Sequence, residues 1–220
     1  MLIVHHLNNS RSQRVLWLLE ELGVPYEIKH YQRDAKTMLA PKELRAVHPL
    51  GKSPVITDGD VTVAETGAIV EYIIENYGKG RLIPGAGTPE RLRYTYWLHF
   101  AEGSAMPPLV MTLLFGEIPK RLPTLIRPIG KMIGGTVQKT FLGPMIDTQL
   151  DLEEAELAKS TYFAGAELTA ADIMMSFPVE AASSRAGLGT RTKLTTWLQS
   201  IHARPAYQRA LQKGGPYAFA

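Results

Sequence analysis

The chain has 220 residues, of which 45% are hydrophobic and 20% charged, and it contains no cysteine. This composition is typical of a globular protein with a sizeable core, and it excludes disulfides, thiolate metal sites and a cysteine nucleophile. The net charge is +3, without the motifs of a nucleic-acid-binding protein. No apolar run suggests a membrane span and the N-terminus has no signal-peptide pattern, so we expect a cytoplasmic protein.

Short strands alternating with helices are predicted for the first 82 residues. The first strand is followed by a helical pattern with Val15 and Leu18 on one face, which Gly23 ends as glycine ends many helices. Asp58-Gly59 lies between two later strands and is a strong hairpin signal. The predicted strands are 2–6, 26–31, 53–57 and 61–64, and the two later helices are 41–47 and 66–77.

The order βαβαββα sets the expected fold class. Two strands joined by a helix pair in parallel and the hairpin adds an antiparallel pair, so we expect a mixed sheet with helices packed on it. After Ile83–Gly87 the strand signals nearly vanish. We therefore predict an α/β domain over 1–82, a linker over 83–87 and an all-helical domain over 88–220, with interruptions at Pro107-Pro108, at Pro119–Pro128 and at Gly143-Pro144.

One stretch of the helical part is strongly basic. It has no acidic residue between Ile118 and Ile146. Such a stretch is either a solvated helix face or a surface that attracts anions, and the sequence leaves both open. Its basic residues are Lys120, Arg121, Arg127, Lys131 and Lys139.

Several segments together resemble the cytosolic glutathione transferase superfamily. The Ser10-Arg11-Ser12 stretch is most similar to a bacterial and fungal Gtt-like branch with a serine-type site. The resemblance implies a thioredoxin-like N-terminal domain, glutathione as co-substrate, no metal, and a homodimer. The segments are NNSRSQRVLWLLEELGVPY (8–26), HPLGKSPV (48–55), AETGAIVEY (64–72), ELTAADI (167–173) and WLQSIHARPAY (197–207).

The resemblance places glutathione beside two short motifs. Lys52, Ser53 and Pro54 would hold its centre, with a cis proline, backbone pairing to the cysteinyl part and a lysine for a carboxylate. Glu65 and Thr66 would hold the γ-glutamyl end, the acid facing the ammonium and the hydroxyl and N–H facing the carboxylate. A helix N-terminus at this point also favours a carboxylate. A surface lysine and a simple helix cap are the alternatives.

The thiol chemistry is expected near Asn9–Ser12. A free thiol has a pKa near 8.5, so a donor to sulfur and a helix N-terminus are needed to favour the thiolate. We predict Ser10 as the catalytic donor and Arg11 as a source of positive charge. Asn9 and Ser12 are alternatives for the sulfur contact, and either serine is also a possible helix cap.

The expected function is conjugation of the glutathione thiolate to small hydrophobic electrophiles. A non-catalytic carrier on the same fold, or a glutathione-dependent peroxidase or isomerase, is the alternative. We expect the electrophile pocket to be lined by residues of the helical domain. Its candidates are Tyr96, Phe100, Met106, Met111 and Phe115, although a stripe of methionine and aromatic residues at helical spacing more often belongs to the core.

The six histidines show no metal-ligand spacing.

Thr169 and Asp172 have the spacing of a helix capping box. The threonine is expected to cap the helix while the acid bonds back to the Thr169 N–H. Leu168 and Ile173 are placed as a hydrophobic staple around it. We therefore predict a structural role for Asp172, with a catalytic role as the alternative.

Overall fold

The computed structural model describes residues 1–34, 37 and 39–219. Its first part is a four-stranded sheet in the order β2-β1-β3-β4. β1 pairs in parallel with β2 and antiparallel with β3, so that Val4 lies between Ile28 and Ile56. This confirms the mixed sheet. The strands are β1 (Leu2–Leu7), β2 (Glu27–Tyr31), β3 (Val55–Asp58) and β4 (Val61–Ala64).

Four boundaries of the first three strands differ from the prediction: β1 ends at Leu7, β2 begins at Glu27, and β3 spans Val55–Asp58. β3 begins at Val55 rather than Ser53, because Pro54 has no N–H to donate to the sheet. β1 runs one residue further, to Leu7, which brings its end close to the start of α1. The hairpin turn at Gly59 is present, with φ of 58°.

Helix α1 (Ser12–Leu22) is buried on nearly all sides. Gly23 caps it in the left-handed conformation, as predicted. α10 (Pro205–Gly214), from the far end of the chain, packs along α1, with the Trp17 and Tyr207 rings 5.4 Å apart and Arg209 paired to Glu20 at 2.8 Å. α1 is thereby held between the sheet and the helical part. The other helices beside the sheet are α2 (Glu43–Val47) and α3 (Thr66–Tyr77).

The helical part begins with a continuous helical rod that runs through Pro107-Pro108. The predicted break at these prolines is therefore wrong. A one-turn π-helix, η1, joins α4 to α5 and accommodates the prolines. Pro108 cannot donate to the carbonyl of Ser104, and that oxygen accepts instead from Gln149 Nε2 at 2.9 Å. The helices are α4 (Pro89–Phe100), η1 (Ala101–Ala105), α5 (Met106–Arg121), α6 (Arg127–Val137), η2 (Gln138–Leu142), α7 (Gly143–Leu157), α8 (Ala170–Arg185) and α9 (Thr192–His202).

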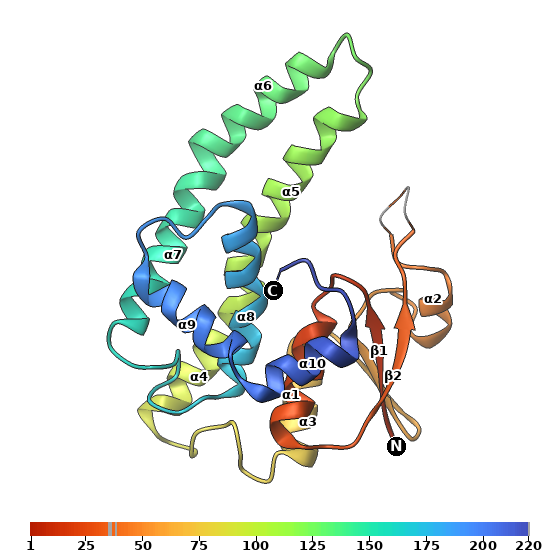
Figure 1. Cartoon of the computed structure of the whole chain (residues 1–220), viewed down its shortest axis with the longest axis vertical. Helices are drawn as coiled ribbons and strands as arrows, with labels where there is room; N and C mark the ends of the chain where they lie inside the picture. Colours follow the sequence, from red (N-terminus) through yellow and green to blue (C-terminus); the bar gives the residue numbers. More distant parts are fainter. Residues whose placement is uncertain (35–36, 38, 220) are drawn as a thin grey trace.

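The break at Gly143-Pro144 is wrong for the same reason, since η2 carries the chain from α6 into α7. The break between Pro119 and Pro128 is confirmed, and it separates α5 from α6. These two helices stand out from the rest of the molecule as a hairpin (Figure 1). The predicted basic stretch therefore lies on this hairpin and its continuation. The division into independently folding domains at 82 and 88 stays a prediction.

The predicted capping box is present at the start of α8. Asp172 Oδ2 accepts from Thr169 N at 2.9 Å, and Oδ1 accepts from Phe163 N at 2.9 Å. The acid is completely buried. It therefore joins the helix start to the preceding loop, as a structural residue does.

A second buried acid, Glu153 on α7, has no hydrogen-bond partner for Oε2 among the described residues. Burial raises the pKa of Glu153 to about 8, against the opposing charge of Arg191. The folded chain thus favours the neutral carboxyl. Stability is lost as pH rises from the unfolded-state pKa near 4.5 through the folded-state value near 8.

We expect Glu153→Gln to stabilise the protein above pH 8 and to change it little at pH 4.5. Above pH 8 the free energy of unfolding should rise by about 2 kcal/mol after allowance for water penetration, which raises the melting temperature by roughly 4–8 °C. Thermal melts at the two pH values measure it. Exposed Glu75→Gln is the matched control, and an equal gain at both pH values would contradict the assignment.

Candidate functional site

The turn between β1 and α1 forms one wall of a cavity of about 390 Å³. Asn9 adopts φ of 49°, a left-handed conformation that asparagine tolerates better than most residues. Asn9, Ser10 and Arg11 line the cavity from this turn, and Ser53 lines it from the sheet edge. The opposite walls are apolar, from Met106, Val110, Leu113, Phe177 and Phe219.

Ser10 belongs to a buried chain of hydrogen bonds. Its hydroxyl lies 2.7 Å from that of Ser12, which lies 2.8 Å from Nδ1 of His6. Ser12 also accepts from the Leu7 N–H at 3.3 Å. Burial and the neighbouring His30 lower the pKa of His6 to about 4, so the ring is neutral at neutral pH. Of the two serines, only Ser10 lines the cavity.

A second, more polar cavity of about 220 Å³ adjoins the first. The predicted residues Lys52, Ser53, Pro54, Glu65 and Thr66 all line it. The Ser53-Pro54 bond is cis, and Ser53 Oγ donates to the His5 carbonyl at 2.8 Å. Glu65 adopts φ of 71° immediately before α3, a costly conformation of the kind that clusters at functional sites.

Arg11 and Ser53 line both cavities, so the polar and the apolar cavity form one composite site. Arg11 is paired with Glu102 at 3.1 Å, and Glu102 also pairs with buried Arg14. These two cations lower the pKa of Glu102 despite its burial. A ligand that fills the polar cavity can therefore place an atom beside Ser10 while the apolar cavity stays open to a second molecule.

Comparison with known proteins shows the family to which the chain belongs. The family described as "Glutathione S-transferase, N-terminal domain" matches residues 1–75. Glutathione S-transferase 3 of Schizosaccharomyces pombe is 36% identical, over 97% of this chain and 88% of that protein. The chain belongs to the glutathione S-transferase family.

Solved structures of other glutathione S-transferases agree over the full length. One from Actinobacillus pleuropneumoniae has a TM-score of 0.82 and 31% identity, over 100% of this chain and 95% of that chain. A theta-class transferase from Xanthomonas axonopodis pv. citri, with glutathione bound, has a TM-score of 0.71 and 25% identity, over 95% and 96% of the two chains. The thioredoxin-like fold inferred for the transferase is thereby confirmed.

Sequence reasoning missed several residues that line the composite site. Arg33 and Arg185 line the apolar cavity, and His48 and Glu102 line the polar one. The C-terminal segment also reaches the site, where Ala218 N donates to Asn9 Oδ1 at 2.8 Å. Helical periodicity carries no signal for a tail outside any helix, or for a residue brought in from a distant helix.

The predicted electrophile-pocket residues are only partly brought to this site. Met106 lines the apolar cavity, but Phe115 lines a different one and Met111 lines neither part of the composite site. Tyr96 and Phe100 stack on each other, 5.7 Å apart, on α4. The aromatic stripe of α4 therefore packs on itself, and α5, α8 and the C-terminal tail supply the cavity wall instead.

The described residues hold no group of three or more histidine, aspartate or glutamate side chains arranged to bind a metal. No helix within the described ranges is long and apolar enough to cross a membrane. Of the histidines, His5 contacts the Tyr31 hydroxyl at 3.0 Å and His6 contacts Ser12.

Proposed function

We propose that this transferase binds glutathione in the polar cavity and conjugates its thiolate to small hydrophobic electrophiles in the apolar cavity. The observation that carries the proposal is the position of Ser10. It stands where a polar cavity with charged groups of both signs adjoins an apolar one. A tripeptide with an ammonium, two carboxylates and a thiol matches the first cavity, and an apolar substrate matches the second.

In this proposal each end of glutathione has a partner. Glu65 faces the ammonium, and the Thr66 hydroxyl and N–H at the start of α3 face the γ-glutamyl carboxylate. Lys52 faces the other carboxylate, and the backbone at Ser53-Pro54 pairs with the cysteinyl part. The positive end of α3 adds to carboxylate binding.

Ser10 donates a hydrogen bond to the thiolate and so lowers the pKa of the bound thiol. Each serine hydroxyl has one hydrogen. If Ser10 gives its hydrogen to sulfur, Ser12 must donate to Ser10, and the hydrogen in the Ser12–His6 contact must come from Nδ1 of His6. The proposal thus specifies the Nδ1–H tautomer of a neutral His6, in which the ring cannot also donate to the backbone of Gly214. ¹⁵N NMR of the ring distinguishes this form from the Nε2–H tautomer that the Gly214 contact favours.

The electrophile lies against Phe177, Phe219 and the apolar side chains of α5. The thiolate sulfur forms a bond to the electrophilic carbon, while the electron pair moves to a leaving group or an activating substituent. The cations Arg11, Arg33 and Arg185 around this cavity favour an anionic leaving group. Holding both reactants in adjoining cavities supplies proximity.

Turnover of an aromatic halide with glutathione, measured beside calorimetric glutathione binding, tests the function. Binding without turnover over a broad panel of electrophiles would favour a carrier. If the protein neither binds glutathione nor turns over any electrophile, the proposed function is wrong.

We expect Thr66→Val to raise KM for glutathione about tenfold while kcat changes little. Valine is close to threonine in size but loses one hydrogen bond to a charged group, which is worth roughly 1.5 kcal/mol. Steady-state kinetics with glutathione as the varied substrate measure this. Thr62→Val, on the exposed side of β4, is the control, and an unchanged KM in Thr66→Val would remove Thr66 from the site.

We also propose a cytosolic homodimer that acts in detoxification, on the strength of family membership. The α5–α6 hairpin exposes apolar side chains, including Leu114, Ile118, Ile129 and Met132, and a two-fold interface would bury such surface. We expect light scattering at micromolar concentration to give twice the chain mass of 24.3 kDa. A monomeric mass would contradict the dimer.

A further inference from the structure

The hairpin tip, residues 121–127, comprises the turn between α5 and α6 and the cation on either side of it. Figure 1 shows this turn projecting away from the rest of the molecule. Leu125 is 90% exposed, and Ile126 beside it is 43% exposed. These side chains add little to the core of the chain, and apolar surface gathered at a projecting point is typical of contact with another surface.

The positive charge of the chain is concentrated on the same hairpin. The segment from Ile118 to Ile146 has five basic residues and no acidic one, whereas the whole chain has a net charge of +3. The rest of the chain is therefore net negative. Among the described residues, only Lys120 of these five has a carboxylate within ion-pair distance, that of Glu117 at 2.6 Å. Such a distribution of charge orients the hairpin toward an anionic surface.

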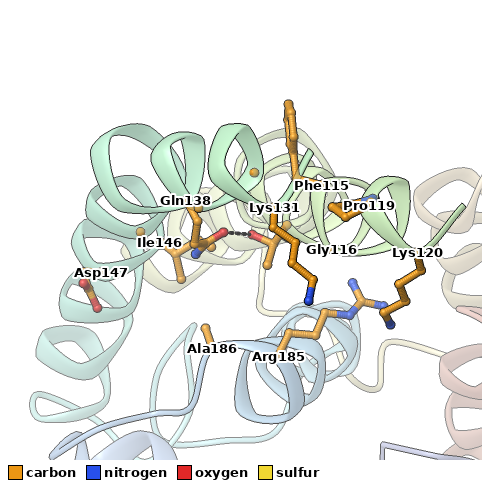
Figure 2. Close-up of a pocket in the computed structure, with 14 residues that line it drawn as sticks. Phe115, Gly116, Pro119, Lys120, Lys131, Gln138, Ile146, Asp147, Arg185 and Ala186 are labelled. Atoms are coloured by element: carbon orange, nitrogen blue, oxygen red, sulfur yellow. Dashed lines mark hydrogen bonds between the residues drawn. The ribbon is translucent and has the colours of Figure 1, made fainter. Parts of the chain in front are cut away.

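Four of the five cations lie close to the exposed leucine. Arg121 ends α5 and Arg127 begins α6, one on each side of the turn. Lys131 follows Arg127 by about 6 Å along α6 at the usual helical rise. Figure 2 shows the side chains of Lys120 and Lys131 extending toward the same side of the hairpin. The tip therefore combines an apolar end with a positively charged side.

An anionic lipid surface fits this combination better than other partners do. A second copy related by a two-fold axis would bring the basic tip against itself, because such an interface pairs the same surface of both copies. The side chains proposed above for a two-fold interface lie on α5 and α6 themselves, below the turn. A nucleic acid would match the charge but would leave Leu125 and Ile126 without an apolar partner. A bilayer with anionic headgroups accepts both kinds of side chain.

We propose that the hairpin tip docks this protein reversibly on membranes that contain anionic lipids. Leu125 and Ile126 enter the outer part of the acyl region, while Arg121 and Arg127 stay at the level of the lipid phosphates. Leu113, which lines the electrophile cavity, lies about 12 Å along the helix from Arg121. A protein docked by the tip therefore keeps its cavities outside the acyl region, and the docking does not depend on what the cavities bind.

Sedimentation of the full chain with lipid vesicles tests the charge requirement. Vesicles of phosphatidylglycerol and phosphatidylcholine in about equal parts should bind the protein at least tenfold more tightly than phosphatidylcholine alone at about 50 mM salt. Raising the salt to about 500 mM should weaken this binding at least tenfold, because exposed charges are then screened. Arg121→Glu should also weaken it at least tenfold, since each cation near an anionic surface contributes about fivefold. Lys42→Glu, at an exposed position of the N-terminal part, is the matched control and should stay within about threefold of the parent.

A tryptophan at the tip distinguishes insertion from adsorption. The three tryptophans of the chain are buried, so a change in the emission of Leu125→Trp reports on the added ring. With anionic vesicles this emission should shift to the blue. Leu92→Trp, at a position on α4 that is 74% exposed, is the control and should show no shift. Leu125→Ser should weaken vesicle binding at least fivefold, because less apolar surface then leaves water.

Several outcomes would overturn the proposal. These are the absence of binding to anionic vesicles, equal weakening by Arg121→Glu and Lys42→Glu, or unchanged emission of Leu125→Trp with vesicles. Light scattering should give the same mass for Leu125→Ser and the parent, and a changed mass would assign the tip to contact between copies instead. Melting curves establish that each variant is folded. Glutathione binding and turnover are measured in the same variants without vesicles and should be unchanged, so the proposed function and the membrane docking can fail independently.

Discussion

Ser10→Ala should lower kcat of the glutathione conjugation about 100-fold, the usual loss when one donor to a developing or resident anion is removed. The alanine methyl fits where the buried hydroxyl lies, so the turn between β1 and α1 is expected to keep its shape. Glutathione still finds Lys52, Glu65 and Thr66, and its dissociation constant should change by less than about threefold. The pH at which turnover reaches half its maximum should rise, because the thiolate has lost a partner.

Variants of the neighbouring residues separate the donor from its supports. Ser12 contacts Ser10, His6 and Leu7 but does not line the cavity, so Ser12→Ala should lower kcat by a smaller factor than Ser10→Ala. Asn9→Gly keeps the left-handed backbone and removes only the side chain that Ala218 contacts. Wild-type turnover in Ser10→Ala with a large loss in Asn9→Gly would transfer the sulfur contact to Asn9.

Much of this candidate site was predicted from the family resemblance, and the local signals are consistent with the places of its residues in the structure. Glu65 and Thr66 come directly before and at the start of a helix with a clear apolar face, and the Ser53-Pro54 pair precedes a strand. The hydrogen bonds from Ser12 to His6 and Leu7 could not be predicted in the same way. They depend on the distance between the end of β1 and the first turn of α1, which only the folded sheet determines.

In the helical part, local sequence patterns predicted the start of a helix but not how the helices are connected. The cap at Thr169 is a local pattern, and the structure contains it. The continuity of α4 with α5 across two prolines was not predictable from local rules. Those rules predict a break at Pro107-Pro108. In the structure a π-helical turn carries the helix through the prolines, and Gln149 donates to the Ser104 carbonyl that lacks a backbone partner. The resulting rod brings Met106 and Val110 of α5 to the cavity in place of the aromatic stripe of α4.

Asp172→Ala should destabilise the fold strongly while leaving the site intact. The carboxylate is fully buried and accepts from three donors, the N–H groups of Phe163 and Thr169 and the Thr169 hydroxyl. Alanine leaves these donors without a partner in a region with little water, at a cost of about 3 kcal/mol or more. The melting temperature should fall by roughly 6–12 °C and the refolding yield should drop.

The pH dependence of this loss has a definite sign. Burial raises the pKa of Asp172 to about 6, against the lowering effect of its hydrogen bonds to Phe163 and Thr169. The folded state therefore favours the neutral carboxyl, and the wild-type chain loses part of this stabilisation as pH rises from the unfolded-state pKa near 3.8 through about 6. The difference in melting temperature between the wild type and Asp172→Ala should thus be larger at pH 4 than at pH 8.

Kinetics on the folded fraction complete the test. Asp172 lines neither the polar nor the apolar cavity, so KM for glutathione should stay near the wild-type value once the concentration of folded enzyme is taken into account. Asp60→Ala, in the exposed hairpin turn, is the control and should change the melting temperature little. Unchanged stability with abolished turnover in Asp172→Ala would mean that this carboxyl takes part in the reaction rather than in joining α8 to the loop before it.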